Sequence, residues 1–332
     1  MRENYQSVFI EILKRLAPGN LNLAEEVSQL LGISADSTYR RLRGETELTL
    51  NETVMLCRHF DIPLEALNHE LPDVVTFKIN KLSDSVNSFS GYLDGLEKDL
   101  INILKSEGNN LHYAAEDLPL FYHFFFPELA RFKMIYWTKS IMNVSSYQGY
   151  KVEDMQFPDD WVGRAKGISE LFAKVPTIEI WNEDTIKSTL QQIKFYWEAG
   201  FFKEKETMQN VMGEFKALID MVHKQAEVGH KYNPWKGQYS QTPYSLYISD
   251  LMIGNNCVFF SAGEKRSSYI GYNSFNYMRT ANHYFNDQVQ KWLQNLIGKS
   301  TLVSAVAEKH RNQFFKEQMR RTDLLLAQLS AD

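Results

Sequence analysis

The residues best suited to recognition chemistry lie in one short stretch, between Gly32 and Gly44. Gly32 permits a tight turn, and Ser34 can cap the helix that follows it. Within that helix Thr38 is expected to face inward together with Leu42, four residues later. The side chains that then point outward are Asp36, Tyr39, Arg40 and Arg43. Arginine suits guanine edges and phosphates, and aspartate can accept a hydrogen bond from cytosine, so this surface is typical of a helix that enters the major groove.

Five short helices are expected to position this surface within an all-α domain, residues 1–72. Apolar residues recur at helical spacing along it, and glycines or a Pro-Gly pair end the first three helices. Thr49 can cap a fourth helix, and Pro63 suits the first turn of a fifth at residues 64–67.

Residues 21–67 resemble the phage-repressor-type (Cro/Xre-like) helix-turn-helix, including the distal pair of helices that ends with the sequence Phe60–Leu67. The resemblance implies a domain that binds double-stranded operator DNA. Matched to that motif, the positions of base contacts are Ala35, Asp36, Tyr39 and Arg40. The positions of phosphate contacts are Ser34, Ser37 and Arg43.

The whole chain also resembles long bacterial helix-turn-helix regulators in which a domain of uncharacterised function follows. Two stretches carry this likeness, Tyr113–Phe121 and Gly298–Ser304 with the following Glu308-Lys309. It implies a bacterial transcription regulator and no particular ligand.

The charge of the first domain leaves an alternative open. Residues 1–72 hold seven Lys and Arg against eleven Asp and Glu, although residues 34–44 alone hold three Arg and one Asp. Many DNA-binding domains are basic, because they neutralise phosphates. The alternative is a protein-interaction module, in which the helical bundle binds a partner protein and no DNA.

A heptad pattern follows the first domain, within a linker and helix that span residues 73–109. Its apolar positions are Leu82, Val86, Phe89, Leu93, Leu96, Leu100 and Ile103. This a/d spacing predicts a coiled-coil interface, and a repressor that binds two half-sites is expected to be a homodimer. In the competing interpretation this helix packs on its own α+β domain, which Gly91 and Gly95 favour.

Residues 110–332 are expected to form a larger α+β domain with an antiparallel sheet and several long helices. Strands are predicted at 111–115, 245–253, 257–261, 267–272 and 301–306, with hairpin turns at Gly254-Asn255 and Gly263-Glu264. A polar loop is predicted at 229–243. Helices are predicted from 182 or 183 to 199, and at 203–228, 279–297 and 308–329.

Aromatic residues of this second domain suggest a sensor. A largely apolar pocket with a few hydroxyls would suit a small, partly apolar effector. Its candidate lining is Tyr136, Trp137, Tyr247, Phe259, Tyr269 and Tyr272. The rival interpretation is that these rings only fill a core and that the domain serves dimer assembly. A nucleotide is not expected, because Leu293 stands where a phosphate loop ending at Gly298-Lys299-Ser300 needs glycine.

Composition excludes several further classes. The chain has 332 residues, a net charge of -5 and two cysteines, Cys57 and Cys257, too few for a disulfide framework. It holds no apolar run of membrane length and no secretory signal, so a cytoplasmic location without membrane attachment is expected. Motifs of catalysis, metal binding and cofactor binding are missing, so we expect neither an enzyme nor a bound metal or cofactor. The sequence therefore predicts a dimeric DNA-binding transcription regulator.

Overall fold

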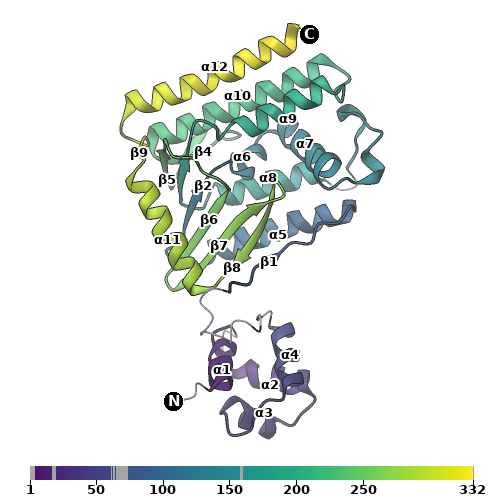
Figure 1. Cartoon of the computed structure of the whole chain (residues 1–332), viewed down its shortest axis with the longest axis vertical. Helices are drawn as coiled ribbons and strands as arrows, with labels where there is room; N and C mark the ends of the chain where they lie inside the picture. The colour runs from purple at the N-terminus through teal and green to yellow at the C-terminus, as the bar shows by residue number, and fades with distance from the viewer. Residues whose placement is uncertain are drawn as a thin grey trace. The chain divides into compact units, whose positions relative to one another are not determined.

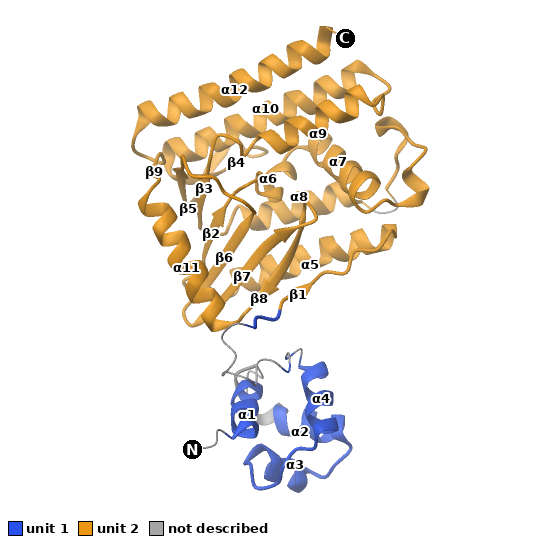
Figure 2. Ribbon diagram, in the orientation of Figure 1, with its two compact units in different colours: residues 1–76 blue, residues 77–332 orange. Residues whose placement is uncertain are grey.

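The computed structural model describes residues 4–16, 20–60, 62, 64, 74–157 and 160–331. The chain divides into two compact units, residues 1–76 and 77–332 (Figure 2). The expected linker and heptad helix therefore belong for the most part to the second unit.

The first unit is a bundle of helices (Figure 1). The described helices are α1 (Tyr5–Leu16), α2 (Asn20–Leu31), α3 (Ala35–Leu42) and α4 (Leu50–His59). They enclose a core of their own, formed by Phe9, Leu13, Leu23, Val27, Leu56, Cys57 and Ile62. Most of the expected fifth helix, residues 65–67, lies outside the described residues.

In the second unit the described strands form one mixed sheet, with the order β1-β8-β7-β6-β2-β3-β5-β4 and β9 paired to β5. The strands are β1 (Lys78–Ile79), β2 (Asn110–Ala114), β3 (Thr177–Trp181), β4 (His230–Asn233), β5 (Gln238–Ile248), β6 (Cys257–Ala262), β7 (Lys265–Tyr272), β8 (Asn276–Thr280) and β9 (Thr301–Leu302). The expected α+β domain is present and most of its strand pairs are antiparallel, but the sheet is mixed, because β2, β3 and β5 run parallel at its centre. Long helical crossovers join these three strands, as parallel pairing requires.

Helices cover both faces of this sheet (Figure 1). The α-helices are α5 (Val86–Leu104), α6 (Leu120–His123), α7 (Pro127–Ile135), α8 (Trp161–Phe172), α9 (Lys187–Glu198), α10 (Lys205–Val228), α11 (His283–Gly298) and α12 (Glu308–Ala331). A π-helix, η2 (Tyr136–Ile141), continues α7, and two 3-10 turns follow, η3 (Ser145–Tyr147) and η4 (Val152–Asp154). Alternate residues of the central strands divide between a large core and a smaller one under α11. The sheet therefore separates two apolar layers.

The heptad helix α5 does not offer an interface for a second copy. Most of its apolar face is buried in the large core of its own unit, with Phe89 and Leu93 fully inaccessible. The ring of Phe89 lies 4.6 Å from that of Trp161 on α8, whose indole Nε1 donates to Ser90 Oγ at 2.9 Å. The coiled-coil interpretation is wrong, because a heptad pattern equally describes a helix that packs on neighbours within one chain.

Several predicted elements have different bounds in the structure. The polar loop predicted at 229–243 contains β4 and the first half of β5. The strand predicted at 301–306 is limited to β9, and α11 begins at His283 because the preceding residues form β8. Strand β3 and helix α8 had no prediction. In the described part of the chain, no helix has the length and apolarity needed to cross a membrane.

Candidate functional site

Local hydrogen bonds fix the start of helix α3. Gly32 adopts a φ of +64°, a left-handed conformation that glycine tolerates best, and ends α2. Ser28 Oγ donates to the carbonyl oxygen of Ile33 at 2.7 Å, which closes the turn. Ser34 then caps α3, because its Oγ accepts from the backbone N–H of Ser37 at 3.2 Å. The turn between α2 and α3 is therefore built as its sequence predicts.

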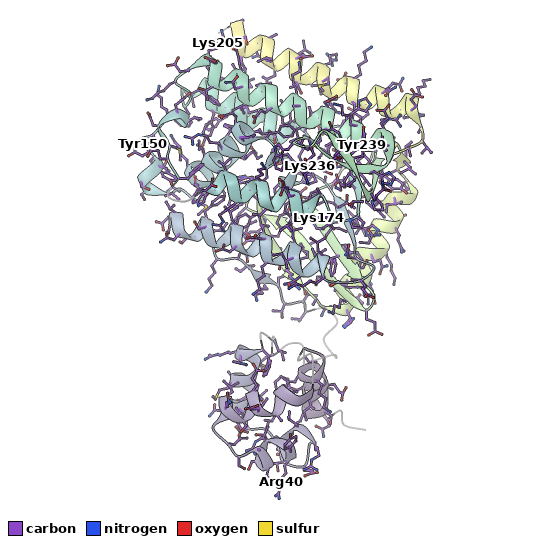
Figure 3. The ribbon with its side chains drawn as sticks, turned by 180° about the vertical axis from the view of Figure 1, so that it is seen from behind. Arg40, Tyr150, Lys174, Lys205, Lys236 and Tyr239 are labelled. Atoms are coloured by element: carbon purple, nitrogen blue, oxygen red, sulfur yellow. The ribbon has the colours of Figure 1, made fainter. Side chains whose placement is uncertain are left out.

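Helix α3 presents one polar face outward. Thr38 is fully buried against the bundle, while the side chains of Arg40 and Arg43 are 58% and 60% exposed. Figure 3 shows Arg40 at the outer surface of the first unit. The other predicted contact residues lie on the same short segment: Ser34, Ala35, Asp36 and Tyr39 are exposed, and Ser37 is half-buried. The structure thus brings all seven predicted DNA-contact residues together.

Exposed ion pairs hold the two outward arginines. Arg40 Nε lies 3.1 Å from Asp36 Oδ2, and Arg43 Nε lies 3.2 Å from Glu45 Oε1. Exposed pairs of this kind contribute about 0–1 kcal/mol, so they can exchange for a stronger acceptor at little cost. A guanidinium has five N–H donors, which leaves donors for a phosphate or a base edge.

Arg41 has a different role, because it connects α3 to α4. Its guanidinium donates to Glu52 Oε1 at 2.9 Å, and both side chains are largely buried. Glu52 also accepts from the backbone N–H of Thr49 in a capping box at the start of α4. Burial raises the pKa of Glu52, but the bonds from Thr49 and Arg41 outweigh burial and hold the pKa below its usual range. Arg41 therefore holds α3 against α4 and does not belong to the outward face of α3.

The predicted effector pocket is not present as expected. Tyr247 and Phe259 belong to the layer under α11, whereas Trp137 and Tyr269 belong to the large core on the other face of the sheet. Tyr136 contacts that large core, and the Tyr272 hydroxyl donates to the carbonyl oxygen of Asn80 at 3.4 Å. The six residues do not line a common cavity, because the sheet separates Tyr247 and Phe259 from Trp137 and Tyr269.

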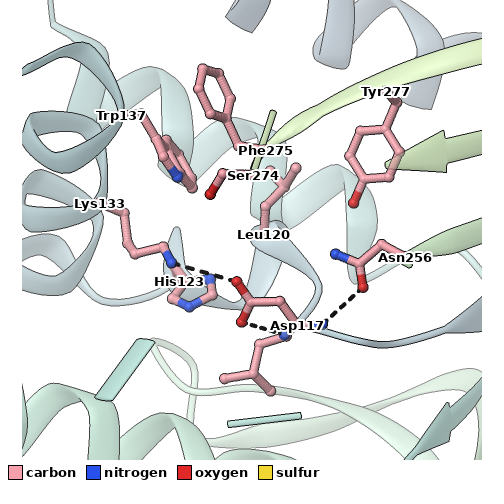
Figure 4. A pocket seen from close by; sticks show the side chains of 10 residues that line it. Asp117, Leu120, His123, Lys133, Trp137, Asn256, Ser274, Phe275 and Tyr277 are labelled. Atoms are coloured by element: carbon pink, nitrogen blue, oxygen red, sulfur yellow. Dashed lines mark hydrogen bonds and ion pairs between the residues drawn. The ribbon is translucent and has the colours of Figure 1, made fainter. Parts of the chain in front are cut away.

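A small polar cavity lies instead beyond the carboxyl end of β2 (Figure 4). Its volume of about 10 Å³ matches one water molecule. Lys133 Nζ donates to Gln192 Oε1 at 2.8 Å and lies 4.0 Å from Asp117 Oδ2. Asn256 Oδ1 accepts from the backbone N–H of Asp117 at 3.0 Å. The cavity is too small for an organic substrate, so we assign these groups a structural role.

His123, which lines this cavity, is expected to make the second unit less stable in acid. Its pKa lies well below its usual value, because burial and the nearby Lys133 ammonium both disfavour the imidazolium. Below about pH 6.5 the unfolded chain binds a proton that the folded chain refuses, so stability falls as pH falls, by about 1.4 kcal/mol per pH unit for one such group.

Urea unfolding between pH 5 and 7 measures this effect. A His123→Gln variant keeps a polar group near Thr189, whose Oγ1 lies 3.1 Å from His123 Nε2. We expect the free energy of unfolding of the variant to change less with pH than that of the wild type, by the contribution of one proton. If the free energy of unfolding changes equally with pH in the variant and the wild type, His123 is not the group responsible.

A second polar cluster lies wholly within the large core. Glu179 on β3 and Lys231 on β4 are 0% and 1% exposed, and Lys231 Nζ lies 3.4 Å from Glu179 Oε1. Tyr122 Oη donates to the same carboxylate oxygen at 2.5 Å, and Trp181 Nε1 donates to Oε2 at 3.0 Å. Neither the cavity beside Asp117 nor the groove beside α11 is lined by Glu179 or Lys231. The sequence did not predict the Glu179–Lys231 pair, because the two residues lie on separate strands and share no motif.

Two negative findings bear on the choice of site. Among the described residues, no group of three or more His, Cys, Asp or Glu side chains gathers as a metal site. Comparison with family models, curated proteins and solved structures found no match to this chain. The candidate functional site therefore rests on the geometry of α3.

Proposed function

We propose that this protein is a sequence-specific DNA-binding transcription regulator whose helix α3 enters the major groove of operator DNA. The observation that supports this most is the capped, outward face of α3 with the exposed guanidinium groups of Arg40 and Arg43. Thr38 is buried against the bundle, and the first turn of α3 is exposed. Docking in the major groove requires such an exposed first turn, because its residues contact the base edges.

Residues 1–72 are acidic overall, but three of their seven Lys and Arg residues lie between residues 34 and 44. Of the exposed acids near α3, Asp36 and Glu45 already pair with Arg40 and Arg43. In the complex we expect Arg40 to contact a base edge, and Asp36 to accept from a cytosine amino group or to keep the guanidinium oriented. Arg43 is expected to meet a backbone phosphate.

A homodimer belongs to the proposal, because regulators of this docking class bind two half-sites about one helical turn apart. Its interface must differ from the heptad face of α5, which is buried within one chain. A second candidate function is a protein-interaction module without DNA binding. Leu50 and Met55 on α4 favour it, since both apolar side chains are exposed.

Selection of bound fragments from a random duplex library tests the proposed function. We expect recovery of one short motif and a steep fall of affinity with salt. Failure to enrich any sequence, with retention of one protein partner from the same cells, would support the interaction module instead.

Replacing Arg40 by alanine is expected to weaken binding of the selected site by about 1–3 kcal/mol and to relax the preference at one base pair. Arg43→Ala is expected to weaken binding to all DNA sequences alike. It should also reduce the slope of log affinity against log salt concentration by about 1. Fluorescence anisotropy with matched and mismatched duplexes separates these two effects.

Arg58→Ala is the matched control, because it removes the same charge from an exposed position on α4. We expect this variant to bind the selected site with wild-type affinity. Wild-type binding by both Arg40→Ala and Arg43→Ala would show that α3 does not contact the DNA.

A further inference from the structure

An open groove lies beside α11, on the face of the sheet opposite the large core. The loop before β6, strand β7 and one side of α11 line it. The lining residues are Gly254, Asn255, Cys257, Ile270, Gln288, Val289 and Trp292. Its volume of about 340 Å³ falls within the range of small-molecule sites. The candidate pocket residue Phe259 lies in the apolar layer next to it, with Cys257 and Val289.

The chemistry of this lining is apolar and uncharged. Ile270, Val289 and the Trp292 ring, which is 40% exposed, supply the apolar walls. No Asp, Glu, Lys, Arg or His side chain belongs to the lining. Burial raises the pKa of the Cys257 thiol to about 12, so it stays protonated at neutral pH and is no nucleophile. An ion placed here would lose hydration without gaining a partner.

Two side-chain amides give the groove its polar character. Asn255 lies on the loop before β6 and Gln288 on α11, and both are exposed. Neither makes a side-chain hydrogen bond to any described residue, so each keeps donors and an acceptor for a ligand. Apolar walls with a small number of hydrogen-bonding groups are the usual composition of a small-molecule site.

We propose that this groove binds a small, uncharged, largely apolar molecule that carries an amide or hydroxyl group. The apolar body would lie against Trp292, Ile270 and Val289, and the polar group would meet Asn255 and Gln288. Effector binding at this place does not require that the first unit bind DNA, so this proposal and the proposed function can fail separately.

Phenylacetamide and phenylacetate are the probes, because they have nearly the same shape and differ in charge. Ligand-observed NMR titration of the full chain measures both affinities. We expect phenylacetamide to bind at least about tenfold more tightly than phenylacetate, since the groove offers no cation to a carboxylate. Equal affinities, or no binding of phenylacetamide, would overturn the proposal.

Two variants test whether the probe occupies this groove. Gly254 does not adopt the left-handed conformation, and a Cβ built on it meets nothing within 4 Å, so Gly254→Leu places a side chain at the groove wall without strain. Trp292→Ala removes the exposed ring. We expect each variant to weaken phenylacetamide binding by about tenfold or more.

Each variant has a matched control. Gly149→Leu makes the same change at an exposed glycine with open space around its Cβ, outside the groove. Tyr284→Ala removes an exposed ring from α11 outside the lining. Both controls are expected to keep wild-type affinity, and probe binding unchanged in Gly254→Leu and Trp292→Ala would overturn the proposal. Sedimentation that finds a wild-type dimer and a Gly254→Leu monomer would make the groove an interface between copies and overturn it too.

Discussion

Replacing Lys231 by methionine is expected to lower the free energy of unfolding of residues 77–332 by about 3–5 kcal/mol. The substitution leaves the carboxylate of Glu179 fully buried without its cation. Methionine has nearly the same length and keeps the apolar contacts of the lysine stem. The expected loss therefore comes from the unpaired charge and not from a cavity.

The surroundings of Lys231 explain why the loss is large. Its Nζ lies 4.3 Å from the ring centroid of Phe172 and 4.8 Å from that of Tyr244, and it donates to Tyr122 Oη at 3.0 Å. Burial lowers the pKa of Lys231 to about 8, although Glu179 opposes this effect, so the ammonium form prevails at pH 7. The Lys231 ammonium then lies in a region inaccessible to solvent, 3.4 Å from the Glu179 carboxyl group.

Urea unfolding followed by far-UV circular dichroism measures this loss. Lys236→Met is the control, because it makes the same change at an exposed lysine five residues later. A double variant with Glu179→Gln removes the unpaired charge, and glutamine Oε1 can still accept from Tyr122 or Trp181. We expect it to recover more than half of the loss. Equal stability of the single variant and the control would contradict the role of the pair.

Local features of the structure were predictable from the sequence. Caps and glycines mark the ends of α2 and α3, because the first turn of a helix and the turn before it depend on neighbouring residues alone. Strands β6 and β7 were found because a Gly-containing turn joins two alternating segments. Helices α10 and α12 were found within a few residues of their bounds.

Contacts between distant segments were not predictable in the same way. Strand β3 pairs with β2 and β5, each more than 50 residues away, so no hairpin signal marks it. Within β3, Glu179 looks like an exposed residue of an alternating strand, and only the fold brings Lys231 to it. The expected pocket failed for a related reason: alternation within one strand does not say which face another strand presents.

Replacing Leu93 by lysine is expected to unfold residues 77–332 and to leave the first unit folded. Leu93 is fully buried in the large core, where a lysine either stays neutral or breaks the packing. Large core residues changed to alanine already cost about 2–5 kcal/mol, and a buried amine costs more. The first unit has its own core, so its helices are expected to survive.

Tryptophan fluorescence separates the two units, because all six tryptophans lie between residues 137 and 292. We expect Leu93→Lys to show a red-shifted emission with part of the helical circular dichroism retained. Glu97→Lys, one turn later on the exposed side of α5, is expected to keep the wild-type emission. If α5 were an interface between copies, Leu93→Lys would give a monomer with unchanged fluorescence. That outcome would contradict the burial of this helix in its own unit, since one face of α5 cannot both fill a core and bind a second chain.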